Sequence, residues 1–462
     1  MNQDVMSPLK NPAYRNLFMA QVTSLLGTGL TTIALALLAF DMAGDQAGQV
    51  LGTALAIKMI AYVTVAPVAG GLAHLLPRKA TLIFLDIVRA GLILTLPFLS
   101  TQWQLYGVIF ALNVCSASFT PLFQAIISDL LPCEERYTKA LSYSRLAYDL
   151  ENIVSPSLAA FLLIYWSFDN LFMINGVTFL VSAVLVLLTA IPKAALTQRE
   201  KSVWKNITFG VRAYLKTPRL RGLLALHGVV ALGGAMVIVN SVVYVRSYLG
   251  LGESETAGVM MASGAGSMLV ALYLPKVLKT VPDRPLMVLG GSIIASALLW
   301  GMLLPSLLGV VCIWFLLGAG WSFIQTPAAR VVNRSAHEGD RAAFFSANFA
   351  LSHGAWFIAY SGAGWLGANI GLSQTFVVMA CAAFFMTLWA LKLWPTNDPV
   401  VVEHVHKAHD HDHPHTHNDH HHDHPHEGWE GPEPHVHEHR HTEVRHAHRF
   451  VIDAHHIRWP QR

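Results

Sequence analysis

The sequence predicts an all-α membrane protein with twelve transmembrane helices in two six-helix halves, followed by a disordered histidine-rich C-terminal tail. Of its 462 residues 53% are hydrophobic and only 13% are charged, which is too apolar for an ordinary soluble domain. Apolar runs of the length that a helix needs to cross a bilayer recur through the first 394 positions. The remaining residues, from Pro395 to Arg462, hold 20 of the 24 histidines.

Each predicted span is an apolar run of roughly twenty residues or more, the length that the hydrocarbon core demands of a helix. The polar start of the chain leads directly into the first run, which is too long for the core of a cleavable signal peptide. The twelve runs cover about 17–42, 50–73, 80–100, 104–128, 140–165, 170–192, 222–246, 255–275, 286–304, 307–329, 342–367 and 372–394.

Basic residues gather in every second loop between these spans, and short loops rich in Lys and Arg stay in the cytoplasm. Arg78 and Lys79 lie in the second loop, whereas the first loop carries Asp41 and Asp45 instead. The tail carries 6 Lys+Arg against 12 Asp+Glu, so residues 1–394 carry 25 against 16, a net charge of +9. The pattern predicts a multi-pass membrane protein with both termini in the cytoplasm.

A long basic connection around residues 193–221 separates the first six spans from the last six. The two halves show weak sequence similarity to each other, since the segment SASFTPLFQAII of the first half resembles GWSFIQTPAARV of the second. The expected organisation is an N-terminal half at 1–192, a cytoplasmic linker at 193–221, a C-terminal half at 222–394 and a metal-binding tail at 395–462.

The tail predicts the binding of a divalent transition metal. Imidazole suits nickel, cobalt, zinc and copper(II), and no Cys or Met in the tail selects copper(I). Interleaved aspartates add oxygen ligands and negative charge, while the composition cannot form a packed core. A cloning tag would be an uninterrupted run, and a low-complexity tail without a metal is the other alternative. The expected ligands are His404, His406, His409, His411, His413, His415, His417, His420, His421, His422, His424, His426, His435, His437, His439 and His441.

Charged residues inside the membrane are functional candidates because they are costly to bury there. Asp86 and Arg89 are three apart on one helix and predict a structural pair. Arg145 and Asp149 are four apart and predict another, while Glu151 has no cationic partner nearby along its helix. We therefore expect the proton-coupling path to use Glu151 first, then Asp149 with Arg145. Whether Asp149 or Glu151 faces the path stays open.

Two histidines of the second half are candidate metal ligands inside the membrane. His353 lies near the middle of the eleventh span, at a depth similar to that of Glu151 in the fifth. His227 lies nearer the cytoplasmic end of the seventh span. A lone helical histidine is also common as a hydrogen-bonded core residue, so both interpretations stand.

Two motifs and the order of segments resemble a known family. GGLAHLLPRK, from Gly70 to Lys79, is similar to the loop signature of the major facilitator superfamily, with His74 where that family has Asp. ENIVSPSLAA, from Glu151 to Ala160, is similar to the motif of its proton antiporters. Twelve spans followed by a histidine-rich tail resemble the NreB-like nickel resistance exporters. That resemblance implies export of Ni²⁺, and of Co²⁺ as the alternative, across the plasma (inner) membrane of a bacterium. The spacing of the histidines does not distinguish nickel from zinc or cobalt.

The expected function is proton-coupled metal efflux that confers metal resistance. Outward movement of a dication against ~100 mV costs roughly 4.6 kcal/mol, and no GxxxxGK[ST] sequence is present to bind ATP. The expected partners are the metal ion, protons and the lipid bilayer, with no nucleic acid, no required cofactor, no enzymatic activity and a monomeric state. The alternatives are an exporter of drugs or siderophores with an accessory tail, and a membrane-bound metal receptor.

Overall fold

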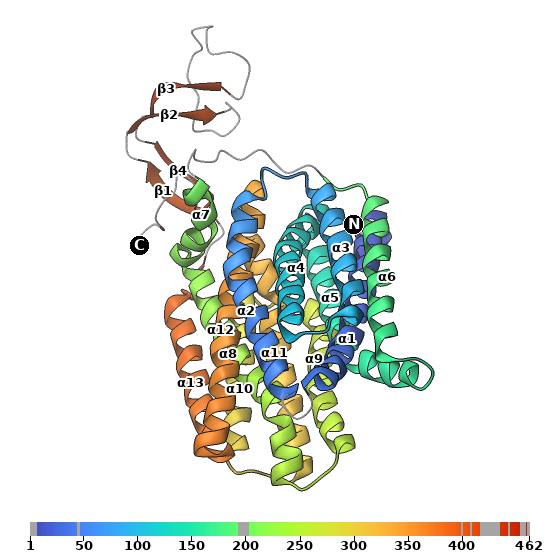
Figure 1. Cartoon of the computed structure of the whole chain (residues 1–462). Helices are drawn as coiled ribbons and strands as arrows, with labels where there is room; N and C mark the ends of the chain where they lie inside the picture. Colours follow the sequence, from blue (N-terminus) through green and yellow to red (C-terminus); the bar gives the residue numbers. More distant parts are fainter. Residues whose placement is uncertain are drawn as a thin grey trace.

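The computed structural model describes residues 7–43, 47–192, 203–398, 401–406, 409–415, 435–441, 444–452 and 459. Twelve long helices form one bundle, and a linker helix lies at one end of it (Figure 1). The first six are α1 (Pro12–Ala43), α2 (Ala47–Leu72), α3 (Arg78–Thr95), α4 (Gln102–Leu130), α5 (Glu134–Leu163) and α6 (Phe168–Leu187). The last six are α8 (Pro218–Val239), α9 (Glu253–Val277), α10 (Asp283–Gly301), α11 (Leu307–Asn333), α12 (Arg341–Ile370) and α13 (Leu372–Leu393).

Short helical turns connect or extend several of these helices. They are the 3₁₀ turns η1 (Pro8–Lys10), η3 (Leu96–Phe98) and η5 (Glu338–Asp340), and the π-helical turn η4 (Val243–Tyr248) beyond α8.

Local sequence explains where some helices begin. Thr101 and Gln104 form a capping box at the start of α4, and Pro218 occupies the first turn of α8, where a missing N–H costs nothing.

Ten helices among the described residues are long and apolar enough to cross a membrane. The other two, α5 and α12, also have 30 residues each; α5 is the most polar of the twelve, and α12 carries Asn348 and His353. Both were expected as spans, and both lie between the halves, where protein covers much of their surface. Polar side chains are tolerated at membrane depth where they face protein or a water-filled path instead of lipid.

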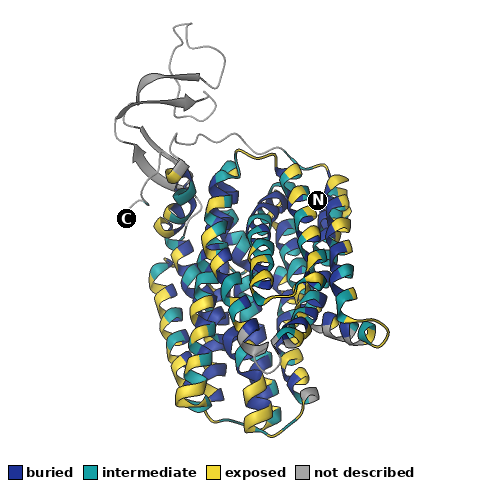
Figure 2. Cartoon of the chain, in the orientation of Figure 1, coloured by how far each residue is buried: buried dark blue, intermediate teal, exposed yellow. Residues whose placement is uncertain are grey.

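The surface of the bundle is apolar while several polar side chains lie inside it. Phe84 and Phe385 are each 64% exposed on outer faces of their helices, whereas Asp86 and Asn175 are almost fully buried. Figure 2 shows exposed residues along the outer helix faces and buried residues toward the middle. This distribution suits a hydrocarbon environment, in which outward apolar side chains carry no penalty.

The two halves meet along two pairs of helices. α2 packs against α12, and α5 packs against α9, while α4 and α11 contact helices of the opposite half. The close approach of α2 and α12 depends on Gly70, because a Cβ there would lie 2.4 Å from the side chain of Ser346. The interface therefore joins helices that are far apart in the sequence.

The linker contains a helix, α7 (Val203–Lys216), which packs on α2 and α12. Two glycines allow this contact. A Cβ on Gly71 would lie 2.5 Å from the Cα of Ile207, and one on Gly210 would lie 2.4 Å from the carbonyl oxygen of Ala343. The end of the bundle that carries α7 is called the linker end below (Figure 1).

Four short strands follow the bundle: β1 (Val401–His406), β2 (His409–His415), β3 (His435–His441) and β4 (Val444–Arg449). β1 pairs antiparallel with β4, and β2 pairs antiparallel with β3. The sequence predicts a tail without regular structure, and the four strands differ from that expectation. The physical basis of this difference is the alternation of residue types in both β2 and β3, a period of two that suits a strand. The histidines within 416–434 lie outside the described residues.

Candidate functional site: a polar cluster between the halves

Glu151 lies on α5 where this helix packs against α1. A Cβ on Gly29 of α1 would lie 3.2 Å from the Cγ of Glu151, so the two helices are close there. Lys58 of α2 interacts electrostatically with Glu151 and also with His353 of α12. Spacing along α5 could not show this cation because it comes from another helix. Glu151, Lys58 and His353 thus form one electrostatic group that spans both halves.

His353 is held by its own helix and by aromatic rings. Its Nδ1 lies 2.7 Å from the carbonyl oxygen of Phe349, which can only accept, so Nδ1 carries the proton. The ring stands edge-on to Tyr62 with centroids 4.8 Å apart, and Lys58 Nζ lies 5.6 Å from the centroid of the same tyrosine. The remaining nitrogen, Nε2, is the atom of His353 that has a lone pair for a proton or a metal ion.

His227 belongs to a second polar group that reaches the linker. Its Nε2 lies 3.1 Å from Asn348 Oδ1 on α12, and the hydroxyl of Tyr214 on α7 donates to the same oxygen at 3.0 Å. Burial raises the pKa of Tyr214, which keeps this hydroxyl protonated and able to donate. Because Asn348 Oδ1 accepts, His227 Nε2 carries a proton and Nδ1 has the lone pair. The linker helix is therefore connected to the interior of the second half.

Arg145 and Asp149 form an ion pair on α5. This confirms the pair that their spacing along the helix predicts. The pair also crosses between the halves. Arg145 Nε donates to Ser267 Oγ of α9 at 2.8 Å, and the Arg145 guanidinium lies 5.0 Å from the ring centroid of Trp321 on α11. Asp149 is 1% exposed and hydrogen-bonds Ser267 as well. Of the two carboxylates in the middle of α5, Asp149 is thus held by a directly bonded cation, and Glu151 is not part of this ion pair.

Asp86 and Arg89 also pair as their spacing predicts. Ser182 Oγ of α6 donates to Asp86 Oδ2 at 2.8 Å, and the Arg89 guanidinium lies 4.2 Å from the ring centroid of Phe119. All of these partners belong to the first half. The pair therefore stabilises the packing of α3, α4 and α6 and has no contact with the second half among the interactions described.

At the linker end, ion pairs join the two halves. Asp129, at the end of α4, binds Arg78 of α3 at 2.5 Å and also binds Arg341 of α12. Sequence analysis missed this role of Asp129, although its position beside two basic loops was a usable signal. One carboxylate between cations from both halves holds them together at this end.

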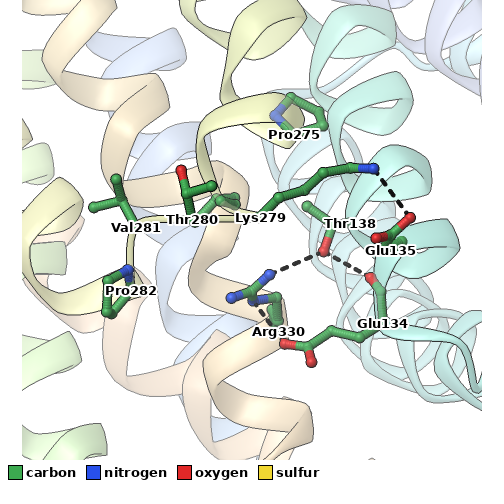
Figure 3. Close-up of a pocket in the computed structure, with 10 residues that line it drawn as sticks. Glu134, Glu135, Thr138, Pro275, Lys279, Thr280, Val281, Pro282 and Arg330 are labelled. Atoms are coloured by element: carbon green, nitrogen blue, oxygen red, sulfur yellow. Dashed lines mark hydrogen bonds and ion pairs between the residues drawn. The ribbon is translucent and has the colours of Figure 1, made fainter.

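A second set of ion pairs lines a cavity of about 400 Å³ between α5 and the α9–α10 connection (Figure 3). Glu134 lies 3.2 Å from Arg330 of α11, and Glu135 lies 3.2 Å from Lys279. Arg330 also contacts buried Asp283 at 3.0 Å. With the pairs of Asp129, these contacts close the linker end across the two halves.

The predicted metal ligands are distributed over two regions. His353 and His227 lie in the interior of the second half, where they interact electrostatically. Among the residues whose side chains are described, no three His, Cys, Asp or Glu groups gather closely enough to hold a metal ion. Ten of the tail histidines named as ligands lie on the described strands β1, β2 and β3.

This architecture defines a class: a multi-pass membrane transporter with two six-helix halves around a polar interior. The chain belongs to the Major Facilitator Superfamily, which residues 17–360 match. Similar folds include the human organic anion transporter MFSD10 (TM-score 0.72, 11% identity, 82% of this chain and 99% of that one). A bacterial homologue of the iron transporter ferroportin in an outward-facing state is also similar (TM-score 0.68, 14% identity, 82% and 99%).

Two sequence relatives are also transporters by name. YfiS of Bacillus subtilis, an uncharacterised MFS-type transporter, is 24% identical over 401 residues, which are 83% of this chain and 95% of that protein. Macrolide efflux protein A of Streptococcus pyogenes is 26% identical over 185 residues, 39% of this chain and 45% of that protein. The chain is therefore a transporter and not an enzyme.

Proposed function

We propose that this transporter exports a divalent transition metal ion, Ni²⁺ first and Co²⁺ or Zn²⁺ as alternatives, in exchange for protons. The tail carries the proposal, because its histidines are repeated on strands that follow directly from the transporter body. In this proposal the protein is a monomer in a bacterial plasma membrane, with the linker end and the tail in the cytoplasm. The NreB-like nickel exporters provide the analogy for the metal.

The direction of transport follows from where the tail would meet its ion. Short basic loops lie at the linker end, and such loops face the cytoplasm. A metal bound there has to move outward against the membrane potential, which costs roughly 4.6 kcal/mol for a dication at ~100 mV. Entry of two protons for each exported ion balances the charge, so the exchange does not work against the membrane potential. The proton gradient then supplies the driving force.

Glu151 is the proton-carrying group in this mechanism, and His353 is the metal ligand of the interior. Lys58 interacts electrostatically with both groups. Binding of a cation at His353 and loss of a proton from Glu151 therefore both change the electrostatic interactions of the same lysine. Asp149 is the second choice, since Arg145 and Ser267 already bind its carboxylate. The coupling is thus assigned to competition between metal and protons within one electrostatic group.

Inside-out vesicles test this function. Vesicles that contain the protein should take up Ni²⁺ when their interior is acidified, and a protonophore should stop the uptake. Control vesicles without the protein should take up none. Uptake that continues unchanged in the presence of the protonophore would contradict proton exchange.

Export of organic compounds is the second candidate, favoured by the 26% identity to macrolide efflux protein A over 185 residues. A tolerance panel separates the two. Cells that lack their own exporters would express this chain and be challenged with Ni²⁺, Co²⁺, Zn²⁺, Cu²⁺, Cd²⁺ and a macrolide. Tolerance to the macrolide and to none of the metals would replace the metal proposal with the organic one.

A further inference from the structure

The linker helix α7 lies across the boundary between the two halves at the linker end (Figure 1). It packs on α2 of the first half and on α12 of the second. At the same end α2 and α12 also contact each other, where Ser346, which is 1% exposed, lies against Gly70. A transporter with a central path must open this end at some stage of its cycle, and α2 and α12 then separate. When they do, α7 cannot keep both of its contacts.

The contacts of α7 with the second half are polar, aromatic and covalent. The fully buried hydroxyl-bearing side chain of Tyr214 donates to Asn348 Oδ1 of α12 at 3.0 Å. The rings of Phe209 and Phe344 meet edge to face, with centroids 6.2 Å apart. The helix also continues into α8 with a single residue, Thr217, between them. A buried hydrogen bond is costly to break because both groups stay out of water, so these contacts favour keeping α7 with the second half.

The contact of α7 with the first half includes close packing of backbone on backbone. A Cβ on Gly71 of α2 would lie 2.5 Å from the Cα of Ile207 and 2.8 Å from its backbone nitrogen. Dispersion between two such surfaces falls off steeply as they separate. This contact therefore stabilises α7 on α2 only while the linker end is closed.

We propose that α7 is a strap that moves with the second half, and that its contact with α2 at Gly71 is the joint that separates when the linker end opens. In the closed state the strap adds to the ion pairs of Asp129, which hold the same end. Because Asn348 Oδ1 also lies 3.1 Å from His227 Nε2, the strap stays connected to this interior histidine. Such a strap would act in the same way on export of a metal ion and of an organic compound, because it belongs to the frame of the body.

Glycine-to-alanine variants show which contact of the strap changes. A Cβ at a contact that exists only in the closed state destabilises that state alone, so the equilibrium shifts toward the open state. A Cβ at a contact that both states keep affects both equally and shifts nothing. Gly71 tests the contact with α2. Gly210 of α7 tests the contact with α12, because a Cβ there would lie 2.4 Å from the carbonyl oxygen of Ala343.

A single cysteine at the contact of α2 with α12 reports the opening. The full-length protein would carry alanine in place of Cys115, Cys133, Cys312 and Cys381, and Ser346→Cys would supply the only thiol. Helix α2 covers this position in the closed state, since Gly70 lies against Ser346. A maleimide added to the purified protein in detergent should therefore label the thiol at a rate that follows the population of the open state.

Gly71→Ala should raise the labelling rate about tenfold, because an overpacked contact typically costs enough to shift an equilibrium by that factor. Gly210→Ala should leave the rate within about twofold of the parent, since both states keep that contact. Tyr214→Phe weakens the same contact without added volume, should also leave the rate unchanged, and decides the question where Gly210→Ala lowers the yield of folded protein. Gly91→Ala, where a Cβ would meet nothing within 4 Å, is the matched control.

Faster labelling in Gly71→Ala, with the other variants at the parent rate, supports the strap. A parent rate in Gly71→Ala would show that α7 does not hold the linker end closed and would overturn the proposal. An equal rise in Gly71→Ala and Tyr214→Phe would also overturn it, since α7 would then leave the second half as well. Labelling is measured without a transported ion, so failure of metal export would appear separately, in the vesicle assay.

Discussion

The body and the tail handle charge in opposite ways. In the body, described charged side chains of the interior have particular partners, as Arg145 has with Asp149, Ser267 and Trp321. In the tail, one side-chain type recurs at every second position of β2 and β3. A charged group with one fixed set of partners can be selective and has a defined protonation state. A ligand that is repeated along a segment instead allows many ions to be bound. Selection and movement of the ion are therefore assigned to the body, and its collection to the tail.

Glu151→Gln should have the largest effect, because it removes the group assigned to proton exchange and leaves the tail unchanged. We expect transport to fall by about 100-fold or more, the scale on which a positioned proton-transfer group contributes. Proton-driven Ni²⁺ uptake into vesicles measures it. Asp169→Asn, a carboxylate at the start of α6, is the control and should transport normally. Full metal tolerance in Glu151→Gln cells would move the coupling role to another residue.

Arg145→Ala should destabilise the body strongly, because it leaves Asp149 buried without its cation. The expected loss is about 3–5 kcal/mol, typical of breaking one side of a buried pair. Lys279→Ala breaks a pair whose side chains are 43% and 42% exposed, and solvent screening limits that loss to about 1 kcal/mol or less. Thermal unfolding in detergent compares the two. Similar losses for both variants would show that Arg145 is not held as described, and the double variant Arg145→Ala with Asp149→Ala should recover part of the stability.

Removal of residues 407–443 should have the smallest effect on transport itself. It deletes β2 and β3 but keeps Asp398, Phe450 and Ile452, so the core of the second half stays covered. Loss of a local metal-binding segment should lower apparent affinity by roughly tenfold through effective concentration, with the maximal rate unchanged. Initial rates of Ni²⁺ uptake at increasing concentration measure both quantities. A complete loss of transport would assign an essential step to the tail and break the division of roles.

Several features were predictable because they depend on local composition. Helices that must cross a bilayer need about twenty apolar residues in a row, and the twelve long helices lie at the expected runs. The pairs Asp86–Arg89 and Arg145–Asp149 were predictable because spacing on a single helix decides which side chains are neighbours. Even the strands of the tail had a signal in the alternation within HDHDHPH and HVHEHRH.

Other features depend on packing between segments that are far apart in the chain. Lys58 acts electrostatically on Glu151 although the two residues lie on different helices, and Asp129 joins the halves only because α12 brings Arg341 to the end of α4. The return of Phe450 and Trp459 to Arg219 belongs to the same class. The sequence by itself thus determined the membrane spans, the pairs within one helix and the ligand type of the tail, because each depends on neighbours along the chain. Only the tertiary structure decided which charges meet across the halves and which histidines face one another, because both depend on where distant segments are anchored.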